Sequence, residues 1–332
     1  MPFIVRSKNQ DFYLIKLSPN FFQVTCRCAL LVIVFAISMM VGGLYTEGDQ
    51  YIYGRVYDAI GALTLAEAFV FYTQSLSSIE IVHFIFIWSL SSYFPKVLLF
   101  SILNTIFAGL IVRVFDLIKV NFLVTCVFLL SNFYMYVLFF AAERLKFGFF
   151  LLVLGLCIQS GKILKNSLIL LSLSAHFQMI LVYAPKAFEV AIASLVRLLK
   201  VQRFNLKILV FLVPLTFLPM ILDSLLAKIQ AYEYIGTGFD YVRMSCFLML
   251  TVWYAAKENS IKSAIIMFVP LFIAVYFVSG DRVNMIAYVY FLYFALRYKN
   301  GLNIGVLLTS IYFFGKTALF LSSINQFGHG FG

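Results

Sequence analysis

Charged side chains are scarce in this sequence. Asp, Glu, Lys and Arg make up 12% of its 332 residues, about half of the roughly 25% found in an average soluble domain. Long apolar runs recur along the whole chain instead, and the alternating pattern of outer-membrane barrel strands is missing. These features exclude a soluble domain and predict an all-α polytopic membrane protein that forms a single integral membrane domain over residues 1–332.

Motifs for nucleotides, metals and hydrolytic chemistry are also missing. The chain contains no Walker A, GxGxxG, HExxH or GxSxG motif. Its five cysteines have neither CxxC nor zinc-ligand spacing, and its acids form no clear cluster for a divalent ion. We therefore expect no cofactor and no metal. The energy for any reaction would come from an activated lipid-phase substrate or from an ion gradient.

The apolar runs predict about eleven transmembrane helices. They cover residues 28–45, 97–118, 121–141, 147–159, 166–184, 188–199, 207–224, 241–256, 263–279, 283–298 and 303–322. Residues 46–96 are expected to form the first outer loop, with an embedded helical segment over 57–94 at the membrane interface, and residues 225–240 the second. Tyr, Trp, Ser and Glu in the embedded segment suit an interfacial position.

Basic residues fix the orientation of these helices. With the N-terminus in the cytoplasm, 16 of the 25 Lys and Arg residues and three of the 14 acids fall on the inner side. This distribution follows the positive-inside rule. The net charge of +11 is therefore explained by topology, and we expect the lipid bilayer, not nucleic acid, as a partner.

Polar chemistry then gathers on the outer side. His176 lies inside the predicted span 166–184, roughly 13 Å from its outer end at 1.5 Å per residue, and Arg144 lies at the outer mouth of the same helical hairpin. Ionisable side chains at such depth are costly and are functional candidates by default. Further candidates in the outer loops are Glu47, Asp49, Arg55, Glu80, Arg243 and Arg282.

Several of these residues carry a family resemblance. The first outer loop reads GDQYIYGRVYDAI, Glu80 opens the embedded segment, Arg144 stands in AAERLKFG, His176 in SLSAHFQM, and Arg282 opens a late span. In this order and spacing they resemble the EpsG-like family of bacterial polysaccharide polymerases, a branch of the Wzy-type O-antigen polymerases. The resemblance covers most of the chain from residue 48 to residue 298.

The resemblance implies a GT-C-like helical fold and a membrane glycosyltransferase. Such an enzyme polymerises undecaprenyl-diphosphate-linked oligosaccharide units at the periplasmic face of the bacterial inner membrane, as in lipopolysaccharide biosynthesis. Its partners would include the lipid-linked oligosaccharide, a chain-length regulator and a flippase. We expect the N-terminus in the cytoplasm and the active face in the periplasm.

This chemistry assigns expected roles to the candidates. Arg144 and Arg282 would bind the substrate diphosphate, because a guanidinium stays charged and binds phosphate oxygens bidentately. Asp49 is the expected general base for the attacking hydroxyl, and His176 would hydrogen-bond a phosphate or carry a proton. Glu47, Arg55, Glu80, Asp58 and Arg243 are secondary candidates.

Structural interpretations stand beside these functional ones. Arg144 and Arg282 could be interfacial anchors, His176 an interhelical hydrogen-bonding residue, and Asp49 a helix cap or a partner of Arg55. Glu80 could be a carboxylate at a helix start, and we expect His83 at the surface or the membrane interface. A flippase for the same lipid-linked sugar and an O-antigen ligase are the alternative functions. A transporter would be expected to show inverted repeats, which the sequence lacks.

Overall fold

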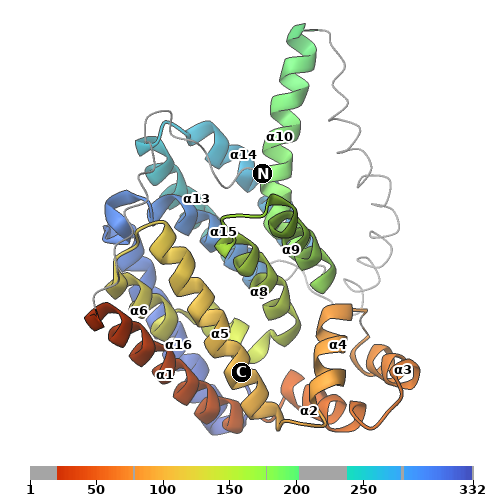
Figure 1. Cartoon of the computed structure of the whole chain (residues 1–332). Helices are drawn as coiled ribbons and strands as arrows, with labels where there is room; N and C mark the ends of the chain where they lie inside the picture. The colour runs from red at the N-terminus through yellow and green to blue at the C-terminus, as the bar shows by residue number, and fades with distance from the viewer. Residues whose placement is uncertain (1–20, 78, 177, 202–237, 278–279, 331–332) are drawn as a thin grey trace. The chain divides into compact units, whose positions relative to one another are not determined.

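The computed structural model describes residues 21–77, 79–176, 178–201, 238–277 and 280–330, and contains helices but no strands within those ranges (Figure 1). The first half comprises α1 (Phe21–Leu44), α2 (Asp49–Ile60), α3 (Leu65–Leu76), α4 (Ile81–Leu90), α5 (Lys96–Leu117), α6 (Phe122–Ser131), α7 (Phe133–Tyr136) and the π-helix η1 (Val137–Ala141). The second comprises α8 (Glu143–Cys157), α9 (Lys162–Ala175), α10 (Met179–Val201), α13 (Gly238–Lys257), α14 (Ile261–Phe277), α15 (Gly280–Ala295), the 3₁₀ helix η2 (Tyr298–Gly301) and α16 (Ile304–Phe327).

Three described helices are long and apolar enough to cross a membrane: α1, α5 and the segment Tyr298–Phe327. A fourth candidate is the pair formed by α6 and Phe133–Ala141, which bends by 56°. These helices confirm the prediction of a helical membrane protein. The full set of eleven spans and the GT-C-like arrangement stay predictions, and the expected span 207–224 and most of the loop 225–240 lie outside the described residues.

Two predicted spans differ from the structure. The stretch 166–184 is not one helix, because α9 ends at Ala175 and His176 has extended backbone angles (φ −159°, ψ 129°). The stretch 188–199 is not a separate span but part of α10, which begins at Met179 and contains Pro185. The expectation that His176 lies inside a continuous helix is therefore wrong: it lies at a helix break.

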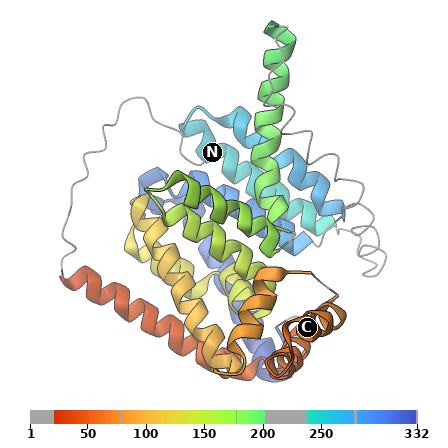
Figure 2. The same cartoon turned by 45° about the vertical axis from the view of Figure 1, so that its right-hand side comes forward.

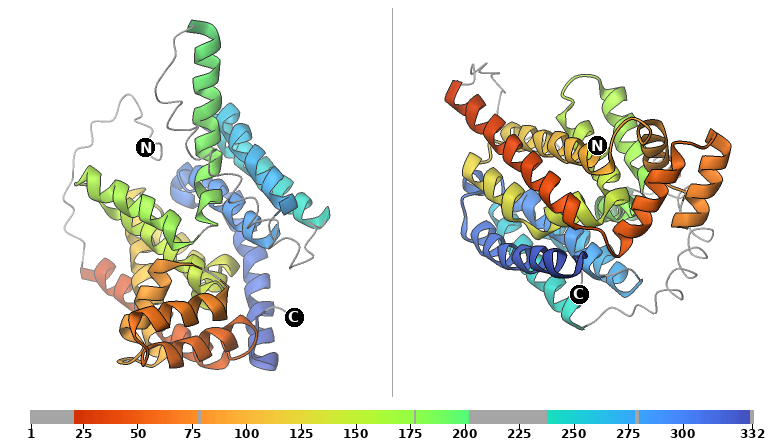
Figure 3. Two further views of the ribbon diagram at one scale, coloured as in Figure 1. Left: turned by 90° about the vertical axis from the view of Figure 1, so that its right-hand side faces the viewer. Right: turned by 90° about the horizontal axis from the view of Figure 1, so that it is seen from below.

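The chain divides into two compact units. One contains residues 25–180 and 295–332, and the other contains residues 1–24 and 181–294. In the second unit, α13 and α14 pack against each other as a helical hairpin (Figure 3). Whether the whole chain forms a single integral membrane domain stays a prediction, because it concerns how both units insert into one bilayer.

In the larger unit, α8 packs between α5 and α9 (Figure 1). Two glycines of α8 permit the close approach of α9. A Cβ on Gly155 would meet Ile169 Cγ1 at 3.0 Å and the Lys165 carbonyl at 3.3 Å, and a Cβ on Gly148 would overlap the Met179 side chain. Small residues of this kind let membrane helices pack closely, and here they bring the break at the end of α9 beside α8.

The expected embedded segment is a group of short helices, α2, α3 and α4, that pack on one another (Figure 2). The turn before α3 has a capping box, in which the Thr64 hydroxyl accepts a bond from the Glu67 amide and the Glu67 carboxylate accepts one from the Thr64 amide. Aromatic side chains fill the core between these helices, α5 and α8. With 10 to 12 residues each, the three helices are shorter than the described helices that could cross a membrane.

Candidate functional site

The start of α8 presents two ionisable side chains to different neighbours. The π-helix η1 ends at Ala141, the backbone angles of Ala142 (φ −105°, ψ 59°) interrupt the helix, and α8 begins at Glu143. Adjacent residues on a helix do not face each other. As a result, Glu143 pairs with Lys96 on α5, while Arg144 pairs with Glu80 before α4.

Arg144, Glu80 and His176 form one hydrogen-bonded cluster. Arg144 Nη1 donates to Glu80 Oε2 at 2.9 Å, and His176 Nδ1 contacts Glu80 Oε1. His176 Nε2 lies 3.2 Å from Gln178 Oε1. The three side chains come from α8, from the residue before α4 and from the break after α9. Their side chains are between 10% and 23% exposed, so a small ligand could still reach them.

Tyr53 on α2 fixes the Arg144 guanidinium. Arg144 Nε donates to the Tyr53 hydroxyl at 3.0 Å, and the guanidinium carbon lies 5.7 Å from the ring centroid. Burial raises the pKa of Tyr53 to about 12, so the phenol stays neutral at physiological pH. Among the described residues, Glu80 is therefore the carboxylate that neutralises the charge of Arg144. Arg144 Nη2 makes no hydrogen bond with a described residue.

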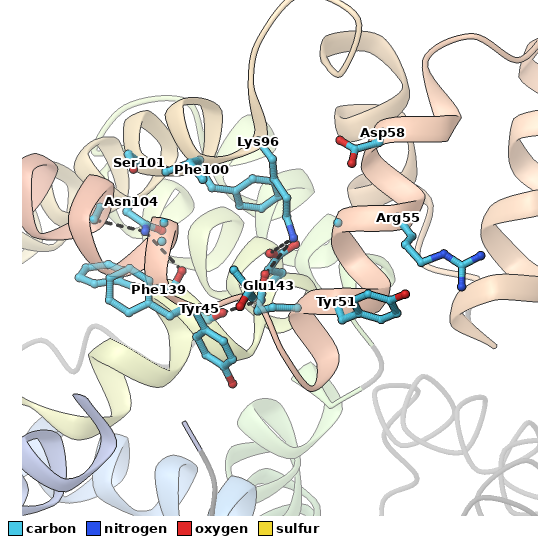
Figure 4. A pocket seen from close by; sticks show the side chains of 18 residues that line it. Tyr45, Tyr51, Arg55, Asp58, Lys96, Phe100, Ser101, Asn104, Phe139 and Glu143 are labelled. Atoms are coloured by element: carbon cyan, nitrogen blue, oxygen red, sulfur yellow. Dashed lines mark hydrogen bonds and ion pairs between the residues drawn. The ribbon is translucent and has the colours of Figure 1, made fainter. Parts of the chain in front are cut away.

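A second polar layer adjoins this cluster through Tyr53. Lys96 Nζ lies 5.6 Å from the Tyr53 ring centroid, 3.0 Å from Glu143 Oε1 and 2.8 Å from Gln50 Oε1. Gln50 in turn donates to the Phe140 carbonyl at 2.6 Å. These groups line a cavity of about 340 Å³, in which Lys96 and Glu143 point toward each other (Figure 4).

His83 lies behind this layer and is buried, so its expected place at the surface or interface is wrong. Burial raises the pKa of Tyr72 and lowers the pKa of His83. The Tyr72 hydroxyl and His83 Nδ1 share a hydrogen bond over 2.9 Å, and its direction follows the tautomer of the imidazole. His83 Nε2 lies 3.8 Å from Glu143 Oε2, beyond hydrogen-bond distance.

The other candidates of the first outer loop lie apart from the Arg144 cluster. Asp49 opens α2 and is exposed, as is Glu47, whose amide donates to the Gly328 carbonyl. Arg55 is exposed, and its guanidinium lies 6.0 Å from the Tyr51 ring centroid and points away from Lys96 and Glu143 (Figure 4). The predicted roles of Asp49, Glu47 and Arg55 remain untested by these positions.

Arg243 and Arg282 belong to the unit that contains α13 to α15. Arg243 pairs with Asp240 one helical turn earlier and with Asp281 at the start of α15. Arg282 is exposed. Asp281 thus pairs with Arg243, and the predicted role of Arg282 stays untested by its position.

Sequence reasoning missed three ionisable residues of the larger unit: the half-buried Lys96, and the buried Glu143 (as a site residue) and Lys146. Lys146 is fully buried; its Nζ donates to the Phe139 carbonyl at 2.7 Å and lies 5.0 Å from the Phe100 ring centroid. Their signal was the run ERLK between two apolar stretches, together with a lysine at the start of the span 97–118. Charges at span ends are usually anchors, and so they did not stand out.

Comparison with known proteins adds no family to this description, since no family model, curated protein or solved structure matches the chain.

Proposed function

We propose that this chain is a membrane glycosyltransferase that polymerises undecaprenyl-diphosphate-linked oligosaccharides into O-antigen or a related surface polysaccharide. In this proposal about eleven spans adopt a GT-C-like fold, and the reaction takes place at the periplasmic face of the bacterial inner membrane. The observation that carries it is the Arg144–Glu80–His176 cluster, in which a cation, a carboxylate and an imidazole from separate segments meet beside a polar cavity.

The proposed reaction is a substitution at a sugar carbon. A hydroxyl oxygen of one lipid-linked unit attacks the anomeric carbon of the growing chain. The bond from that carbon to the phosphate oxygen breaks, and its electron pair stays on the lipid diphosphate. The hydroxyl proton goes to a base of the protein. Catalysis therefore needs a fixed cation near the leaving oxygen and a base near the attacking one.

Arg144 suits the first role. Two of its nitrogens are held by Tyr53 and Glu80, so the guanidinium is positioned before any ligand arrives. Nη2 is left to donate to a phosphate oxygen whose charge grows as the bond breaks. A fixed donor in a site with little water is worth several kcal/mol in such a step.

His176 suits the second role. With its proton on Nδ1, His176 would donate a hydrogen bond to Glu80 Oε1. Once a substrate hydroxyl displaces the Gln178 side chain, the unprotonated Nε2 would accept the proton of that hydroxyl. Glu80 acts as the group that orients the ring. Asp49 remains the alternative base of this proposal, since it is exposed at the start of α2.

The experiment is elongation of a lipid-diphosphate-linked oligosaccharide by the purified protein in nanodiscs, with Arg144→Ala and Arg113→Ala as matched variants, because Arg113 on α5 is exposed and does not line the cavity. We expect a product ladder from the wild type and Arg113→Ala but only single units with Arg144→Ala. In cells, Arg144→Ala should leave single units facing the periplasm. Units trapped on the cytoplasmic side would indicate a flippase, and long chains that never reach the lipid core would indicate a ligase.

A further inference from the structure

A cavity beside the Arg144 cluster has a lining that the proposed chemistry does not use. It lies between the end of α1, α2, the start of α5 and the start of α8, all in the larger unit (Figure 4). Its volume of about 340 Å³ is at the small end of the roughly 300–1,000 Å³ typical of ligand pockets. A ligand of one or two sugar rings is therefore in the right size class.

The charges on its wall cancel. The charged lining residues are two bases, Arg55 and Lys96, and two acids, Asp58 and Glu143. Lys96 and Glu143 already neutralise each other at 3.0 Å. A free anion or cation would find no net attraction in such a lining, in contrast to the Arg144 guanidinium next to it. The lining thus favours a neutral ligand.

The wall is also rich in hydrogen-bonding groups. Gln50, Ser38, Ser101 and Asn104 line it together with the four charged residues. Asn104 donates through Nδ2 to Ser38 Oγ and to the Phe139 carbonyl, but its buried Oδ1 has no partner among the described residues. A buried acceptor without a donor is costly. A ligand hydroxyl is one group that would satisfy it.

Aromatic side chains complete the lining. Tyr45, Tyr51, Phe100 and Phe139 are among its lining residues and are labelled in Figure 4. Aromatic surface covers the C–H face of a sugar ring, while carboxylate, ammonium and amide groups bond its hydroxyls. An apolar lipid tail would leave those polar groups unpaired, at a cost of about 1–3 kcal/mol each, so it fits the cavity less well.

We propose that this cavity binds a neutral sugar residue, with the adjoining Arg144 holding the phosphate to which that sugar is attached. The inference rests on the proposed function, because the glycan of the lipid-linked unit supplies the sugar. Tyr53 lies between Arg144 and the cavity: its hydroxyl accepts a hydrogen bond from Arg144 Nε, and its ring centroid lies 5.6 Å from Lys96 Nζ. The cavity would therefore position the sugar, and Arg144 its diphosphate.

Two glycines allow the cavity to be filled without altering any charged contact. Gly43 on α1 and Gly54 on α2 line it, and a Cβ built on either meets no atom within 4 Å. Gly43→Leu and Gly54→Leu should therefore occupy the cavity. Gly315→Leu is the matched control, because a Cβ on Gly315 in α16 also meets nothing within 4 Å and lies outside the cavity. Gly43→Ala is a smaller change at the same place.

The test is saturation-transfer NMR on the full-length protein in nanodiscs, with galactose, glucose, rhamnose and N-acetylglucosamine as neutral probes and inorganic pyrophosphate as the anionic probe. We expect at least one sugar to bind the wild type, Gly43→Ala and Gly315→Leu. Gly43→Leu and Gly54→Leu should weaken that binding about tenfold or more, while pyrophosphate binding is unchanged.

Absence of sugar binding to the wild type would overturn the proposal, and so would sugar binding that neither leucine variant weakens. If Gly43→Leu weakens the binding of pyrophosphate but not the binding of sugar, the cavity binds an anion, and the proposal is overturned. The elongation assay separates this inference from the proposed function. If Gly43→Leu and Gly54→Leu leave elongation intact, the proposal of a sugar-binding cavity is refuted but the proposed polymerase function is not. If the wild type binds sugar but does not elongate the glycan, the polymerase function is refuted but sugar binding in the cavity is not.

Discussion

Replacing Arg144 by lysine tests the site most directly, because the charge is kept and the geometry is lost. An ammonium group can still reach Glu80, but it cannot also donate to the Tyr53 hydroxyl as Arg144 Nε does at 3.0 Å. A hydrogen bond to a charged group contributes about 1.5–3 kcal/mol. If that bond holds the guanidinium in place during reaction, Arg144→Lys should lower kcat/KM about ten- to hundredfold.

Tyr53→Phe removes the same bond from the other side. We expect a comparable loss, and the double variant should be little worse than either single one, because both changes remove one interaction. The assay is the initial rate of elongation in nanodiscs, with thermal unfolding measured in parallel. Arg113→Lys is the control, since this arginine of α5 is exposed and does not line the cavity.

Two results would refute the reasoning. One is a full elongation rate in Arg144→Lys. The other is a double variant whose losses add, since additive losses would mean that Arg144 and Tyr53 act independently. A fall in thermal stability that matches the loss of rate would instead assign the pair a structural role, with no part in the chemistry.

Three further predictions concern the groups around Arg144. Glu80→Gln should destabilise the fold by about 1–3 kcal/mol, because the half-buried Arg144 loses its partner. It should also strengthen inhibition by undecaprenyl diphosphate; unchanged unfolding and inhibition would contradict this. Burial lowers the pKa of His83 in the folded protein. As pH falls through about 6.5, His83 therefore takes up a proton in the unfolded chain before it does so in the folded one. Thermal stability should fall from that pH downward, and it should fall less in His83→Gln. Gly155→Leu should push α9 away from α8 at Ile169 and lower the free energy of unfolding by about 1–3 kcal/mol. It should also abolish elongation, because the shift of α9 displaces His176. Gly315→Leu should have neither effect.

The sequence was sufficient for the helical class and for the positions of several helices. The apolar runs 28–45, 97–118 and 303–322 correspond to α1, α5 and α16, because a long apolar run with at most two charged residues has few alternatives to a membrane helix. Arg144 and His176 were also found from sequence, as ionisable residues in apolar surroundings, and the structure places both on Glu80.

Other features could not be read from the sequence. No proline or glycine marks the helix break at His176 within SLSAHFQM. The burial of His83 depends on α2, α3 and α4 packing together, which is a tertiary effect. Lys96 and Glu143 are 47 residues apart, and only the packing of α5 on α8 brings them to 3.0 Å.

The pairing of Arg144 with Glu80 bears on turnover as well as on structure. An unbalanced guanidinium beside a membrane would bind a lipid diphosphate before and after reaction, and tight binding of the product slows release. Catalysis requires interactions that strengthen in the transition state, not uniformly strong binding. With Glu80 neutralising it in the resting site, Arg144 would attract the ground-state diphosphate only moderately and respond most to the charge that appears as the sugar–phosphate bond breaks. Glu80 makes the cluster resemble an ordinary ion pair, and for the same reason it suits a site that, in the proposed reaction, must release its diphosphate product after every transfer.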